Sequence, residues 1–140
     1  MAVVTNDQLL DKLAEDSSRK WTELAQELNI SDTAIRKRVK KLQEDGVIKR
    51  FTIEIDQRKL GFELTSFIGF DAKAELYIEI LEEIKNWKEV RSIFQTSLDH
   101  DFLMECWFKN NDDLTKFIGR LEKLKGVTMV CPATVIQRLK

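Results

Sequence analysis

The sequence predicts an α+β protein in which a helical N-terminal domain is joined by a strand linker to a ferredoxin-like βαββαβ domain. Between residues 6 and 45, apolar residues recur at helical spacing in three segments that short polar turns separate. Between residues 64 and 138, the spacing changes in the order strand, helix, strand, strand, helix, strand. We therefore predict domains over residues 1–50 and 63–140, with the linker over residues 51–62.

The composition of the 140 residues excludes a membrane protein. Charged residues make up 34% of the chain, and no window approaches the ~18 uninterrupted apolar residues of a membrane helix. Residues 1–7 lack the basic and apolar regions of a signal peptide. Cys106 and Cys131 have the spacing of neither a zinc ribbon nor a disulfide framework, so we expect a cytoplasmic protein with reduced thiols.

The first two predicted helices are short. A capping box that begins at Thr5 predicts a helix over residues 6–15. Thr22 is expected to cap the second helix. Asn29 then tolerates the left-handed backbone of a short turn that leads into a third helix.

The third helix has the clearest start signal in the sequence. Ser31 is the expected N-cap, Ile30 and Ile35 are spaced as a hydrophobic staple, and Gly46 is placed to end the helix. Five of the six residues 36–41 are cations, most of them on the face away from the core. A short helix, a three-residue turn and a basic second helix make a helix-turn-helix, which suits the major groove of double-stranded DNA.

The candidate DNA-binding residues lie on this third helix or just after it. Residues near the helix start are expected to reach base edges, and the cations are expected to contact phosphates. The alternative is a three-helix bundle with a solvated basic surface. The predicted set is Ser31, Thr33, Ala34, Arg36, Lys37, Arg38, Lys40, Lys41, Lys49 and Arg50.

The segment after the third helix predicts a strand over residues 47–56. Phe51, Ile53 and Ile55 alternate there with polar residues. The polar residues 57–62 then predict a turn and a domain boundary.

The C-terminal half gives the ferredoxin-like order. Strands are predicted over residues 64–71, 90–97, 102–108 and 127–138, with helices over 74–87 and from a cap at Asn111 or Asp112 to Gly126. In this topology the last strand lies at a sheet edge, where Pro132 is tolerated. Large apolar residues occur on both faces of the strand 102–108, so we expect a partner to cover the face that the helices leave open.

Residues 28–52, which read LNISDTAIRKRVKKLQEDGVIKRFT, resemble the recognition helix and connecting strand of the leucine-responsive regulator/AsnC (feast/famine) family of transcription factors. Residues 124–127, Leu-Lys-Gly-Val, are similar to the family's Leu-Pro-Gly-Val. The resemblance covers almost the whole chain. It implies a transcriptional regulator of archaeal or bacterial type that forms homodimers through the C-terminal sheets, often octamers, with an amino-acid effector bound between dimers.

The resemblance also implies an effector loop. The family's loop usually reads Gly-x-x-x-Asp or Gly-x-x-Asp, and here Ser97 replaces the glycine while Asp101 matches the acid. The implied effector-binding residues are Ser97, Asp99, His100 and Asp101. The Ser97 hydroxyl favours a small polar amino acid such as glutamine or lysine over leucine. The alternative is a charged turn between two strands.

We expect neither enzymatic activity nor a cofactor. No pattern in the sequence resembles a nucleophile with its base, paired catalytic carboxylates or a phosphate-binding glycine loop. His100 is the single histidine, which leaves little material for a metal site. Two other functions stay open: an effector-independent architectural DNA-binding protein, and an enzyme that resembles the sirohaem decarboxylases of the same two-domain build.

Overall fold

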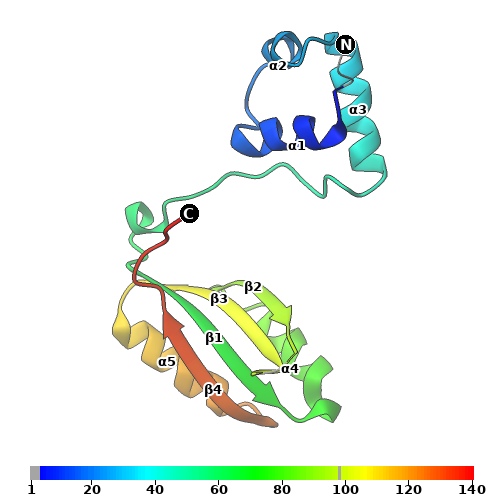
Figure 1. Ribbon diagram of the computed structural model, residues 1–140. Coiled ribbons are helices and arrows are strands. Elements are labelled where there is room, and N and C mark those ends of the chain that lie inside the picture. Colours follow the sequence, from blue (N-terminus) through cyan, green and yellow to red (C-terminus); the bar gives the residue numbers. More distant parts are fainter. Residues whose placement is uncertain (1–3, 98) are drawn as a thin grey trace. The chain divides into compact units, whose positions relative to one another are not determined.

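The computed structural model describes residues 4–97 and 99–140 (Figure 1). The chain divides into two compact units, Met1–Glu54 and Ile55–Lys140, and each has its own hydrophobic core. The division falls inside the predicted linker. None of the helices in these described ranges is long and apolar enough to cross a membrane.

The first unit contains three helices, α1 (Asn6–Glu15), α2 (Trp21–Glu27) and α3 (Asp32–Glu44). The capping box of α1 is present, with both of its reciprocal hydrogen bonds. The predicted cap of α2 is wrong, because Thr22 lies inside the helix and Lys20 is the N-cap without a side-chain hydrogen bond. The Lys20 carbonyl instead accepts the first helical N–H groups from the backbone, so the helix begins without a capping side chain.

The turn between α2 and α3 has the predicted geometry. Asn29 has a φ of 52°, in the left-handed region, and the Ile30 N–H donates to the Ala25 carbonyl at 3.0 Å. Ser31 Oγ accepts a hydrogen bond from the Ala34 N–H at 3.1 Å, which confirms the N-cap. The core beneath the turn is made of Leu9, Leu13, Leu24, Ala25, Ile35, Val39 and Leu42.

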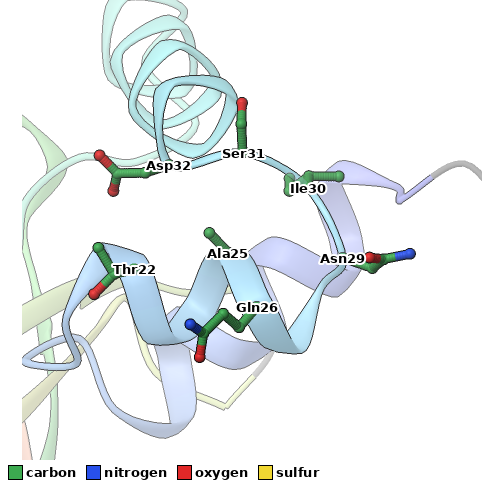
Figure 2. Close-up of a pocket in the computed structure, with 7 residues that line it drawn as sticks. All are labelled: Thr22, Ala25, Gln26, Asn29, Ile30, Ser31 and Asp32. Atoms are coloured by element: carbon green, nitrogen blue, oxygen red, sulfur yellow. The ribbon is translucent and has the colours of Figure 1, made fainter.

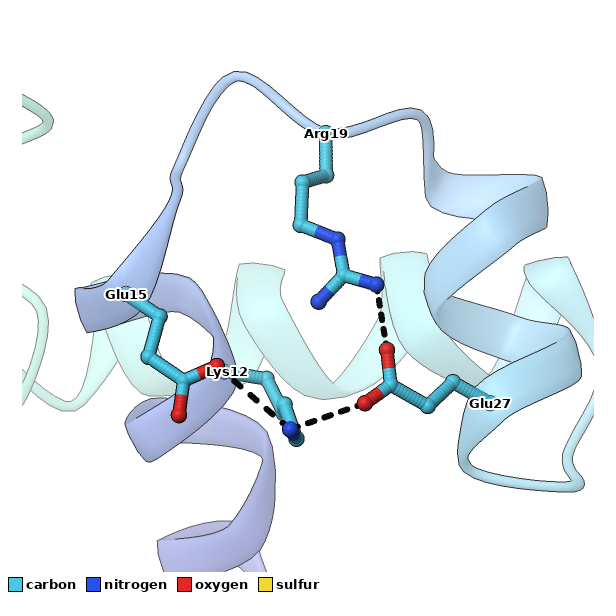
Figure 3. Close-up of polar contacts among 4 residues, drawn as sticks. All are labelled: Lys12, Glu15, Arg19 and Glu27. Atoms are coloured by element: carbon cyan, nitrogen blue, oxygen red, sulfur yellow. Dashed lines mark hydrogen bonds and ion pairs between the residues drawn. The ribbon is translucent and has the colours of Figure 1, made fainter.

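A charged network joins α1 to α2 on the surface of this unit (Figure 3). Lys12 Nζ lies 2.8 Å from Glu27 Oε1 and 3.4 Å from Glu15 Oε2, and Arg19 pairs with the other oxygen of Glu27. The Lys12 and Arg19 cations lower the pKa of the Glu27 carboxyl below its ordinary value. All four side chains are partly exposed, so the network adds little to the stability of this unit.

The strand predicted over residues 47–56 does not form in this single chain. Residues 49–56 have no regular secondary structure, and Phe51, Ile53 and Ile55 are 45%, 78% and 37% exposed. Alternation of apolar and polar residues marks a strand that is buried on one side, and such a strand also needs a neighbour to receive its hydrogen bonds. No strand in the described part of the chain pairs with this segment.

The second unit is the predicted ferredoxin-like fold. Its sheet has the antiparallel order β2-β3-β1-β4, and the two α-helices cover one face of it (Figure 1). The elements are η1 (Gln57–Leu60), β1 (Leu64–Ala72), η2 (Ala74–Leu76), α4 (Tyr77–Ile84), β2 (Val90–Gln95), β3 (Phe102–Phe108), α5 (Asn111–Glu122) and β4 (Val127–Thr134).

Several helices and strands begin or end at other residues than predicted, because the apolar pattern does not indicate where regular backbone hydrogen bonding stops. The predicted helix over 74–87 begins as the 3₁₀ turn η2 and ends at Ile84. The cap of α5 is Asn110, whose side chain accepts from the Asp113 N–H at 2.9 Å, so the predicted caps at Asn111 and Asp112 are wrong. The edge strand β4 stops at Thr134, four residues before the predicted end.

Aromatic rings fill the space between the sheet and the helices. The Phe117 ring of α5 lies 5.2 Å from both the Trp87 ring and the Phe108 ring, measured between centroids, and both pairs are edge-on. Tyr77 meets Phe102 in the same way at 4.8 Å. These contacts attach both helices to the central strand β3.

The buried thiol of Cys106 gives the first testable prediction. Burial raises the pKa of Cys106 to about 12, so at pH 8 roughly one thiol in ten thousand is the reactive thiolate. In a Cys131→Ser variant, Cys106 should therefore react with a chromogenic disulfide reagent only as fast as the protein unfolds. The urea-unfolded chain should react at once. Rapid reaction of the native variant would show that the thiol is accessible.

Candidate DNA-binding helix and effector loop

The exposed face of α3 is the candidate DNA-binding surface. Ile35, Val39 and Leu42 point into the core of the first unit. At 100° per residue, the opposite face holds Thr33, Lys37, Lys40, Lys41 and Glu44, all of which are exposed. The structure therefore brings four of the ten predicted DNA-binding residues onto one surface.

The lysines on this surface differ in their ion pairs. Lys40 Nζ lies 3.7 Å from Glu44, and Lys41 Nζ lies 3.3 Å from Asp45, one helical turn further along. Both pairs are exposed, so either lysine can exchange its carboxylate for a phosphate at small cost. Lys37 has no ion-pair partner among residues 4–97 and 99–140. Among these described residues, the Lys37 ammonium group is therefore available to bind a ligand.

Two of the predicted DNA-binding cations have contacts within the protein instead. Arg36 Nε lies 2.8 Å from Asp32 Oδ2, and its guanidinium lies 5.7 Å from the centroid of the Trp21 ring. Arg38 is half-buried and donates to the Val4 carbonyl at 2.5 Å. Arg38 thus attaches α3 to the segment before α1, while the ion pair of Arg36 lies within α3.

The remaining members of the predicted set flank this surface. Ser31 Oγ is occupied as the acceptor of the cap, and Ala34 is half-buried beside it. Lys49 and Arg50 are exposed in the segment without regular structure that follows α3. They therefore lie outside the surface that α3 forms.

A shallow hollow lies between α2 and the start of α3 (Figure 2). Its lining is Thr22, Ala25, Gln26, Asn29, Ile30, Ser31 and Asp32. Asp32 Oδ1 is buried there without a hydrogen-bond partner among the described residues. The sequence analysis gave Thr22 only the role of a helix cap and did not single out Gln26. Their spacing of four on a helix that precedes a recognition helix was the available signal.

In the predicted effector loop between β2 and β3, the Asp101 side chain is turned toward β1. The Ala72 N–H donates to Asp101 Oδ2 at 3.1 Å, and this bond, with a second one from the Tyr77 hydroxyl, lowers the pKa of the Asp101 carboxyl. The hydrogen bond between the Tyr77 hydroxyl and Asp101 also raises the pKa of Tyr77. The Asp101 N–H in turn donates to Asp71 Oδ1 at 2.9 Å. The acid that matches the family motif therefore ties the loop to the end of β1.

The His100 ring lies over Gly69 on the open face of the sheet. A Cβ atom built on Gly69 would come within 2.2 Å of His100 Cδ2, so only glycine leaves room for the ring. His100 Nδ1 is buried and lies 3.4 Å from Asp71 Oδ1. Gly69 in the interior of a strand was a signal for such a close approach, and sequence reasoning missed it.

The four predicted effector residues do not form one cluster. Ser97 and Asp99 are exposed, His100 covers Gly69, and Asp101 is directed toward β1. Leu98, between them, lies outside the described residues. No group of three or more His, Cys, Asp or Glu side chains suited to a metal ion occurs in the described ranges.

Comparisons with known proteins agree with both units. Residues 8–49 match a winged helix-turn-helix DNA-binding family, and residues 65–140 match the Lrp/AsnC ligand-binding domain. The HTH-type transcriptional regulators LrpA of Pyrococcus abyssi and Pyrococcus horikoshii are 41% and 39% identical over 133 residues, which is 94% of this chain and 94% of each relative.

A transcriptional regulator of Neisseria meningitidis, solved in complex with L-methionine, has the same fold with a TM-score of 0.91. Its sequence is 20% identical, and the match covers 100% of this chain and 93% of that one. Both domain matches, their order along the chain and the nearly full-length relatives lead to one conclusion. This chain belongs to the Lrp/AsnC family of DNA-binding transcriptional regulators, and its second unit is the family's ligand-binding domain.

Proposed function

We propose that this protein is a sequence-specific regulator of transcription whose assembly or DNA binding responds to a small amino acid. The observation that carries the DNA-binding part is the exposed face of α3, where Lys37 has no partner in the described ranges and Lys40 and Lys41 have only exposed ones. These residues are the ones that an inserted helix would turn toward a major groove.

The expected DNA contacts divide by position on α3. Thr33, Ala34 and Lys37 lie in its first half and would reach base edges, while Lys40 and Lys41 would contact phosphates. Thr22 and Gln26 of α2 border the start of α3, where the first helix of this motif crosses the DNA backbone. A twofold dimer presents two such helices, so the expected operator is a pseudo-palindrome with half-sites about one helical turn, or a multiple of it, apart.

Selection of duplexes from a random library tests the DNA-binding part. Lys37→Ala should change the preferred bases, because a lost base contact alters discrimination by about 1–3 kcal/mol at one position. Lys41→Ala, four residues along the same face, is the matched control and should leave the preferred sequence unchanged. Identical preferences for Lys37→Ala and the wild type would show that Lys37 does not read bases.

A homodimer follows from the open face of the sheet. Phe67, Phe94 and Met129 are 38%, 53% and 53% exposed on the side that the helices leave uncovered. Several exposed apolar side chains on one face of a sheet favour a partner that covers it. The same face presents an acid, Glu105, and a cation, Arg91, so a second copy turned about a twofold axis offers complementary charges. Assembly of dimers into octamers belongs to the same proposal.

The effector part of the proposal places the ligand at the loop between β2 and β3. Asp101 has its hydrogen bonds within the protein, so its role is to shape the loop. Asp99 and Ser97 are exposed and are free to bind the ammonium and polar groups of an amino acid. A polar effector such as glutamine or lysine suits this pair.

A thermal-shift screen with each of the twenty amino acids tests the effector part, because a ligand that binds only the folded protein raises its melting temperature. Asp99→Asn should weaken the effective ligand by roughly ten- to a hundredfold, the loss expected for one charge-assisted contact of about 1.5–3 kcal/mol. Glu83→Gln, an exposed acid on α4, is the control. Equal ligand affinity in Asp99→Asn and the wild type would place the site elsewhere.

The second candidate function is an effector-independent DNA-binding protein. The internal hydrogen bonds of Asp101 favour it, as does Ser97 at the position where the family has glycine. In that case none of the twenty amino acids shifts the melting temperature, and the protein binds unrelated duplexes with similar affinity. The two candidate functions therefore predict different results in the thermal-shift screen and in DNA binding.

A further inference from the structure

The open face of the sheet carries one carboxylate near its centre. Glu105 lies on the central strand β3, beside Phe67 of β1 and Ser92 of β2 in the sheet register. The side chains around it on this face include the exposed Phe94 and Met129. A negative charge therefore stands in the middle of a surface that is otherwise largely apolar.

The Glu105 carboxylate has its hydrogen bonds but lacks a counter-charge. Trp107 Nε1 donates to its Oε1 at 3.1 Å, and Ser92 Oγ donates to its Oε2 at 3.2 Å. The guanidinium of Arg91 lies over the Trp107 ring, 4.2 Å from the centroid. Neither Glu105 nor Arg91 forms an ion pair with any described residue. The acid is held in place before any partner arrives.

The free-energy cost of burying the Glu105 carboxylate depends on the partner that covers this face. A carboxylate buried against a purely apolar or acidic surface keeps its desolvation penalty without compensation. A partner with a cation and hydrogen-bond donors removes much of that penalty, and only in the register that brings them to the carboxylate. A second copy of this chain carries such a cation in Arg91 on the same face.

We propose that Glu105 is the residue that determines the partner of this face: it selects a second copy of the same chain and fixes a single register for the pair. A single polar residue fixes register and oligomeric state in this way at apolar helix interfaces. Ser92 and Trp107 act as positioning residues, because they orient the carboxylate. The inference rests on the homodimer of the proposed function.

Sedimentation velocity of the full chain over a range of concentrations tests the proposal. Glu105→Leu removes the charge from the open face, and Glu83→Leu makes the same change on α4, which covers the opposite face. The wild type and Glu83→Leu should give the same dissociation constant for the dimer and the same further assembly of dimers. Glu105→Leu should dissociate about tenfold more readily, because it leaves Arg91 of the second copy in the covered face without its counter-charge.

The outcomes separate this inference from the proposed dimer. A monomeric wild type would remove the dimer itself. A wild type that dimerises, together with Glu105→Leu that has the same dissociation constant, would overturn the role of Glu105 alone. If Glu105→Leu does not fold, Glu105→Gln takes its place, since it keeps an acceptor oxygen. Its dissociation constant should rise about threefold, and an unchanged value would overturn the role equally.

Discussion

Replacing Lys40 and Lys41 together by alanine should weaken DNA binding about tenfold or more near physiological salt, and by the same factor for every duplex sequence. The two ammonium groups lie on the exposed face of α3 and are held only by exposed carboxylates, so they can contact phosphates. Each lost phosphate contact should also lower the slope of log K against log salt by about 0.9. Fluorescence anisotropy at several salt concentrations measures both quantities.

Lys116→Ala with Lys123→Ala is the matched control for this variant. Both residues are exposed cations at α5, so the pair changes the net charge of the protein by the same amount. The control should retain most of the affinity and the salt slope of the wild type. If the double variant at Lys40 and Lys41 behaves like this control, α3 does not lie against the DNA backbone.

Phe117→Ala should destabilise the second unit by about 3–5 kcal/mol, the usual result of deleting a fully buried aromatic ring. Phe117 is 2% exposed and contacts the Trp87 and Phe108 rings, so its loss leaves a cavity between α5 and the sheet. Urea unfolding followed by tryptophan fluorescence should show a much lower midpoint for this unit. Because the first unit has its own core, its helices should unfold as in the wild type.

Ile78→Ala is the control for the core variant. Ile78 is an apolar residue of α4 that is 79% exposed, and surface substitutions of this kind usually change stability by less than about 0.5 kcal/mol. A similar midpoint for Phe117→Ala and Ile78→Ala would mean that the ring does not hold α5 on the sheet. Simultaneous loss of both units in Phe117→Ala would show that the two fold as one.

Local signals in the sequence were sufficient for much of the fold. The capping box at Thr5, the Ser31 cap and the turn at Asn29 involve residues within a few positions of one another, and the structure confirms all three. The strand at residues 102–108 was predicted with its observed bounds, because its alternation is regular and both of its neighbours are present in the chain. The order of helices and strands was then sufficient to predict the topology of the second unit.

Features that depend on contacts between distant residues were harder to predict from the sequence. The strand predicted at residues 47–56 needs a neighbour that the single chain does not supply. Asp101 was predicted as a ligand group, yet its contacts with Ala72 and Tyr77 depend on how the loop packs against β1. The position of His100 over Gly69 likewise joins residues 31 positions apart, which no local pattern indicates.

The proline in the last strand has a consequence for solubility. Pro132 lies in β4, the edge strand, opposite Ile68 of β1. Proline carries no N–H group, so the outer side of β4 lacks a donor at the point where another chain would have to continue the sheet. The addition of strands to this edge is therefore disfavoured, and the concentrated protein should associate through the face of the sheet instead.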